Sequence, residues 1–97
     1  MHWHGIHHKK SNDMDGVIAV TQRTIPVNGS FVYDFLVDGA GSFWYHAHAK
    51  NQYMAGIRGA LIVLDPAQKM YANRFIMLAD WYHTVSKRHT PCFSRLR

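Results

Sequence analysis

The apolar residues of this chain occur in runs no longer than a β-strand, and turn signals separate the runs. The longest run, residues 59–64, is far shorter than the roughly 20 residues that a membrane-spanning helix needs. Asn28-Gly29 is a strong tight-turn dipeptide, and Asp38-Gly39 begins a further turn. Short apolar runs between frequent turns are typical of all-β proteins. The sequence therefore predicts an all-β fold with no membrane segment.

Several short segments have the composition of strands. They are rich in the β-branched and aromatic residues that favour strands, although the last would also suit a helix. The expected strands are residues 17–20, 30–37, 42–48, 57–64 and 74–81. Residues 68–73 are expected to form a linker. The final stretch, 86–97, is basic and without periodicity, so we expect an unstructured tail.

Composition narrows the classes of function. The 97 residues are 47% hydrophobic, which argues against disorder and allows one small domain or part of a larger one. The net charge of +5 follows no single helix or strand and comes with no nucleic-acid motif, so no nucleic-acid partner is expected. Cys92 is alone and cannot form an internal disulfide. No apolar stretch follows a basic start, so no signal peptide is expected in this chain.

Histidine is the unusual residue, and four of the eight histidines form two His-x-His pairs, His2/His4 and His46/His48. Side chains two residues apart on a strand point to the same face. Two such strands side by side would place four imidazoles around one cavity, which suits copper, zinc, iron or nickel. The spacing alone leaves the metal open. A zinc hydrolase would also need a carboxylate base, which Asp13 or Asp15 could supply.

The residues around both pairs extend the pattern. His2-Trp3-His4-Gly5-Ile6 is similar to the first copper motif of laccase-like multicopper oxidases, and residues 42–48 (SFWYHAH) are similar to the second. Met14-Asp15-Gly16-Val17 follows the first motif at the expected distance. The resemblance covers about residues 2–85, and the fungal laccase and ferroxidase branches are the most similar.

The resemblance implies a cupredoxin-like Greek-key β-sandwich that is incomplete in this chain. Residues 1–66 would be part of a plastocyanin-like copper-binding domain. Residues 67–85 would be a linker and the first strand of a following domain, and residues 86–97 an aberrant or disordered tail.

The resemblance also implies roles for the histidines in a trinuclear type 2/type 3 copper cluster, which this chain would provide only in part. His2 would bind the type 2 copper, and His4, His46 and His48 would bind the type 3 pair. Asp15 matches an acidic residue near the cluster that assists proton delivery, and reduction of dioxygen to water does consume protons.

Three histidines outside the two pairs are not expected to bind the metal. His7 and His8 stand where the family usually has an apolar or aromatic residue and Gln, and we expect surface histidines there rather than extra ligands. His83 is expected to be structural.

The family couples one-electron oxidation of phenols, aromatic amines or ferrous iron to reduction of dioxygen, and its members are extracellular. The two late copper motifs are absent from this sequence. We therefore expect the chain alone to be an inactive fragment, with the remaining oxidase domains missing. Two alternatives stay open: a non-catalytic copper- or zinc-binding module, and a gene fragment without function.

Overall fold

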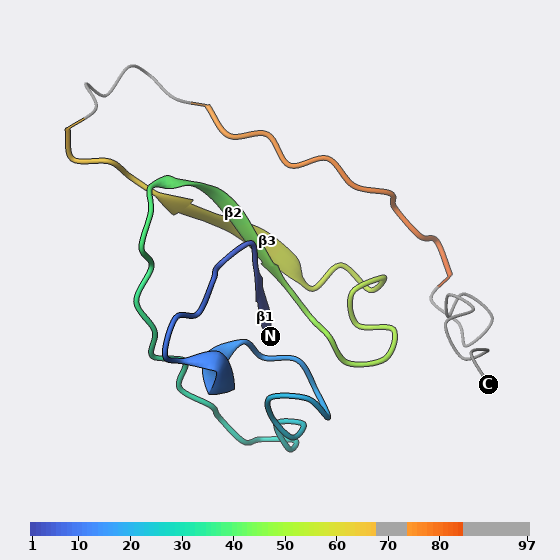
Figure 1. Ribbon diagram of the computed structural model, residues 1–97. Coiled ribbons are helices and arrows are strands. Elements are labelled where there is room, and N and C mark those ends of the chain that lie inside the picture. Colours follow the sequence, from blue (N-terminus) through green and yellow to red (C-terminus); the bar gives the residue numbers. More distant parts are fainter. Residues whose placement is uncertain (68–73, 85–97) are drawn as a thin grey trace, which may run out of the picture.

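The structure is a computed structural model that describes residues 1–67 and 74–84 (Figure 1). It contains a 3-10 helix, η1 (Asn12–Met14), and three strands: β1 (His2–His4), β2 (Gly41–His46) and β3 (Arg58–Val63). The prediction of an incomplete all-β fold is confirmed. No helix in the described ranges is long and apolar enough to cross a membrane.

The three strands form one antiparallel sheet in the order β1-β2-β3, with β2 in the centre. The register of β1 on β2 places His2 opposite His46 and Trp3 opposite Tyr45. Because side chains alternate along a strand, the histidines of both strands lie on one face, and Trp3 and Tyr45 lie on the other. The sheet therefore separates a histidine face from an aromatic face.

The aromatic face holds the sheet to the rest of the domain. The Trp3 ring lies 5.3 Å from Tyr33, 5.4 Å from Phe35 and 5.6 Å from Tyr45, measured between ring centroids. These tilted and edge-on contacts are favourable geometries for aromatic pairs. Among the described residues, Ala47 is the only apolar residue that is buried, at 4% exposure. The packing thus rests on half-buried aromatic rings rather than on a closed core.

The predicted strands at residues 42–48 and 57–64 are confirmed as β2 and β3, each slightly shorter than expected. The predicted strand at residues 17–20 is wrong, because these residues form a turn. The backbone N–H groups of Val20 and Thr21 both donate to the Val17 carbonyl, and Ala19 has a φ of 64°. The Thr21 hydroxyl also accepts from the Val17 N–H, which closes the turn locally.

The predicted strand at residues 30–37 is also wrong, although its side chains do alternate. Tyr33, Phe35 and Val37 are half-buried, while the residues between them are exposed. This segment pairs with no strand in residues 1–67 or 74–84, and a strand requires a partner for its backbone groups. It is held instead by its aromatic rings and by the Tyr33 hydroxyl, which accepts from the Met1 amino group and donates to the Gln22 side-chain oxygen, both at 2.8 Å.

Residues 74–81 form neither a strand nor a helix, and their side chains are exposed. The predicted linker at 68–73, the tail at 86–97 and Cys92 lie outside the described residues. The division of the chain at residues 66/67 and 85/86 stays a prediction.

Candidate metal centre

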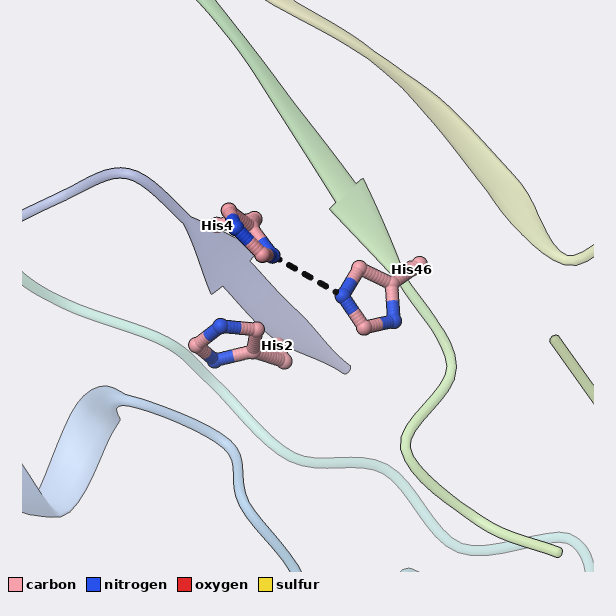
Figure 2. A group of neighbouring side chains, drawn as sticks. All are labelled: His2, His4 and His46. Carbon is pink, nitrogen blue, oxygen red and sulfur yellow. Dashed lines mark hydrogen bonds between the residues drawn. The ribbon is translucent and has the colours of Figure 1, made fainter. Parts of the chain in front are cut away.

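Three histidines converge on the histidine face of the sheet (Figure 2). His2 and His4 come from β1, and His46 is the last residue of β2. One nitrogen from each of these three rings lies within 4.8 Å of the others. The convergence follows from the ladder, because the register sets His46 directly opposite His2, and only Trp3 lies between His2 and His4 in β1.

His48 lies beside this group but outside it. Its ring centroid is 5.6 Å from that of His2 and 5.7 Å from that of His46. The expectation that His46 and His48 share a strand face needs correction, since β2 ends at His46. The Ala47 N–H still donates to the Ile57 carbonyl, at 2.9 Å, before the chain enters the turns that lead to β3. His48 is exposed at the rim of the three-histidine group.

Hydrogen bonds to the main chain determine which nitrogen two of the rings can offer. Nδ1 of His2 lies 2.9 Å from the Asp15 carbonyl oxygen, and Nδ1 of His46 lies 3.1 Å from the Ala47 carbonyl oxygen. A carbonyl oxygen can only accept, so each Nδ1 must carry the proton. In a neutral ring the Nε2 lone pair is then free, which is the usual arrangement of a metal-binding histidine.

His4 meets His46 directly. Nδ1 of His4 and Nε2 of His46 are 3.3 Å apart (Figure 2). Because Nδ1 of His46 already holds the proton of that ring, Nε2 accepts and Nδ1 of His4 donates. For both nitrogens to face one metal ion, the His4 proton must move to its Nε2.

The protonation state of His46 also favours a role as a metal ligand. Burial lowers the pKa of His46 below its usual value, and the positive charges that His2, His4 and His48 would carry act in the same direction. The bond to the Ala47 carbonyl opposes this shift. The neutral form, which is the form that binds metals, is therefore favoured at this ring.

Asp15 lies beside His2, on the side of the ring away from the free Nε2. It follows η1 directly, and its Oδ1 is 3.2 Å from Nδ1 of His2, so the carboxylate and the Asp15 carbonyl share one N–H. Gly16 makes the approach feasible. Its φ is +83°, and a Cβ at this position would collide with the Met1 carbonyl.

His8 is buried, contrary to the expectation of a surface residue, and is only 3% exposed. Its φ is 48°, its ring packs against Phe35 at 4.6 Å, and its Nε2 is 3.8 Å from Oδ1 of Asp15. His7 does face solvent, with a side chain that is 77% exposed. Nothing in the adjacent histidines distinguishes the two, because burial depends on the distant residues 30–37. His83 is exposed.

A groove of about 1020 Å³ lies between the sheet and residues 74–82. Trp44, Tyr53 and Arg58 are among the residues that line it, and the three converging histidines are not. The Arg58 guanidinium donates to the Asp80 carbonyl at 3.2 Å and lies 5.3 Å from the Tyr53 ring centroid. This groove adjoins the candidate metal centre without being part of it.

Comparisons with protein families, curated proteins and solved structures all give matches to this chain. Residues 1–68 match the family model described as multicopper oxidase. The chain is 46% identical to laccase-5 of Trametes versicolor over 95 residues, which is 90% of this chain and 18% of that protein. It is 41% identical to a laccase of Phlebia radiata over 100 residues, which is 94% of this chain and 19% of that protein.

A solved structure, the multicopper oxidase mgLAC, is similar to the chain with a TM-score of 0.62 and 43% identity. The match covers 71% of this chain and 22% of that one. It confirms the prediction of an incomplete cupredoxin-like fold. The chain spans about a fifth of the length of the curated relatives that it matches.

Proposed function

Because this chain belongs to the multicopper oxidase family, we propose that it contributes one part of the copper centre of a laccase-like oxidase. The observation that supports the proposal most directly is the convergence of His2, His4 and His46, whose ligand nitrogens lie within 4.8 Å of one another. Copper is the metal that the family implies, and imidazole is among the ligands that it prefers.

The three histidines fit copper in the chemistry of their donor nitrogens as well as in their number. His2 and His46 each keep Nδ1 protonated toward a carbonyl and carry the lone pair on Nε2, which in His46 accepts from His4 in the metal-free chain. The lowered pKa of His46 favours the neutral ring. Because of these features, a metal ion displaces fewer protons when it binds to this cluster of imidazoles.

The finer assignment follows the family's motifs. His2 binds the type 2 copper, and His4, His46 and His48 bind the type 3 pair. His48 lies at the rim, and its inclusion is supported by ring-centroid distances of 5.6 Å to His2 and 5.7 Å to His46.

Bound copper supplies the electron transfer of this chemistry, in which one-electron oxidation of a phenol, an aromatic amine or ferrous iron is coupled to reduction of dioxygen to water. The role of this chain is to hold the metal and handle protons. Asp15 is 26% exposed and touches Nδ1 of His2 at 3.2 Å, so it can take a proton from solvent and hold it beside the centre.

The remaining parts of the reaction lie with residues that this sequence does not contain. The His-Cys-His motif that would supply the electron-accepting type 1 copper is absent from it. We therefore expect no oxygen uptake with a phenolic donor from the 97-residue chain by itself. Robust turnover by this chain would contradict the assignment of electron entry to another segment.

We also propose that the protein is secreted. Asn28-Gly29-Ser30 is a sequon for N-linked glycosylation, which takes place in the secretory pathway. Asn28 is exposed, has a φ of 62° and belongs to a turn closed by the bond from the Gly29 N–H to the Pro26 carbonyl. Recovery from the culture medium with a glycan on Asn28 would support secretion, and an unglycosylated protein confined to cell extracts would contradict it.

Copper titration of the full chain tests the proposed centre. We expect the wild type to bind Cu(II) with an electron paramagnetic resonance spectrum typical of nitrogen ligands. The double variant His4→Ala/His46→Ala should lose this binding. The matched control His7→Ala/His83→Ala removes two exposed histidines and should retain it. Equal copper content in both double variants would refute the assignment, and a wild type that binds zinc but not copper would favour a non-catalytic zinc module.

A further inference from the structure

His8 is a buried polar side chain whose two ring nitrogens both lack a hydrogen-bond partner. It is 97% removed from solvent, since only 3% of its surface is exposed. Buried polar groups in proteins are nearly always paired, and an unpaired one needs an explanation. The copper ligands proposed above do not include His8, so its burial is not yet accounted for.

The surroundings of the His8 ring restrict what it can contact. Phe35 packs against the ring, with 4.6 Å between the centroids. On another side, Nε2 faces Oδ1 of Asp15 at 3.8 Å. Among the described residues, Asp15 is the only acidic side chain within ion-pair distance of His8.

The same Asp15 oxygen also faces His2. Oδ1 lies 3.2 Å from Nδ1 of His2 and 3.8 Å from Nε2 of His8, so the carboxylate sits between two imidazoles. The three side chains come from β1, from the segment after β1 and from the residue after η1. Only the tertiary structure brings them into one row.

We propose that His8 is a positioning residue for the copper centre: its Nε2–H donates to Asp15 and holds that carboxylate against His2. The present 3.8 Å is longer than a hydrogen bond, so the proposal includes a side-chain rotation that shortens this distance. The inference rests on the proposed function only in treating His2 as a copper ligand. A carboxylate held on the second nitrogen of a metal-binding histidine fixes the ring and strengthens it as a ligand.

The contact is testable in the metal-free chain by nitrogen NMR of the histidine rings at about pH 8, where ordinary imidazoles are neutral. Asp15→Ala should shift the Nε2 signal of His8, because it removes the acceptor. His8→Leu should shift the ring signals of His2, and His8→Gln, whose amide can also donate, should restore most of that change. His7→Leu is the matched control and should leave the His2 signals in place.

Copper affinity supplies a second readout. His8→Leu should lower it about tenfold and alter the copper hyperfine splitting, whereas His8→Gln should recover both. A folded His8→Leu chain with unchanged His2 signals would overturn the proposal. If that variant fails to fold, an unchanged His8 signal in Asp15→Ala, whose side chain is partly exposed, would overturn it instead. Failure of the wild type to bind copper would contradict the proposed function, while the metal-free NMR experiment would still decide the role of His8.

Discussion

His2 and His46 are direct partners across the β1–β2 ladder, and their ring centroids lie 5.3 Å apart. Each ring donates its Nδ1 proton to a main-chain carbonyl, that of Asp15 for His2 and that of Ala47 for His46. The backbone therefore determines both which rings meet and which nitrogen each ring can offer.

The two histidines of the second motif should differ in their importance for copper binding by this chain. His46 belongs to the group of ligand nitrogens within 4.8 Å of one another, and His48 lies outside it. We expect His46→Ala to lower copper affinity by a larger factor than His48→Ala in isothermal titration. An equal loss in the two variants would mean that the bound state recruits His48 fully.

Gly16→Ala should destabilise the chain and displace Asp15 from His2. The φ of +83° costs an L-residue about 1–2 kcal/mol, and the new Cβ would also collide with the Met1 carbonyl. Urea unfolding should show a loss of at least this size. Gly39→Ala is the control, because a Cβ there meets nothing within 4 Å, and it should change stability by no more than about 0.5 kcal/mol.

Gly59→Val should disturb the strand pair that carries His46. Gly59 lies opposite Tyr45, and a Cβ at Gly59 would collide with the Tyr45 ring. Overpacking of this kind costs about 1–3 kcal/mol, to be measured by urea unfolding. Ala60→Val adds the same branched side chain at the next, exposed position and should be nearly neutral. Similar losses in both variants would show that the Tyr45 contact is not the cause.

The metal-free chain should lose stability as the pH falls below about 6.5, the ordinary pKa of histidine. Burial lowers the pKa of His46 in the folded chain, so the unfolded chain takes up the proton first. The stability contribution is complete above the unfolded pKa and is lost as the pH falls through the folded pKa.

Urea unfolding with a chelator present, across pH 5 to 8, measures this loss. His46→Gln removes the titrating group and should flatten the pH dependence relative to the wild type. An unchanged slope in the variant would assign the pH dependence to other histidines.

Much of the candidate metal centre could be predicted from local sequence. Because side chains alternate along a strand, both members of a His-x-His pair lie on one face, and this requires no knowledge of distant residues. The same local reasoning predicted β2 and β3. It did less well at residues 17–20, where the Thr21 hydroxyl and the left-handed Ala19 close a turn that β-branched composition does not indicate.

Contacts between distant segments were decided by the tertiary structure. Strand composition alone could not tell that residues 30–37 would pack through Tyr33 and Phe35 without a ladder partner. It also could not separate exposed His7 from buried His8, because Phe35 and Asp15, which contact His8, lie 27 and 7 residues further along the chain. Alternation is a property of one strand, whereas register and burial depend on which segments meet. The sequence by itself therefore determined that His2 and His4 would share a strand face. Only the folded chain decided that His2 lies opposite His46, with Asp15 beside His2 and His8 beside Asp15.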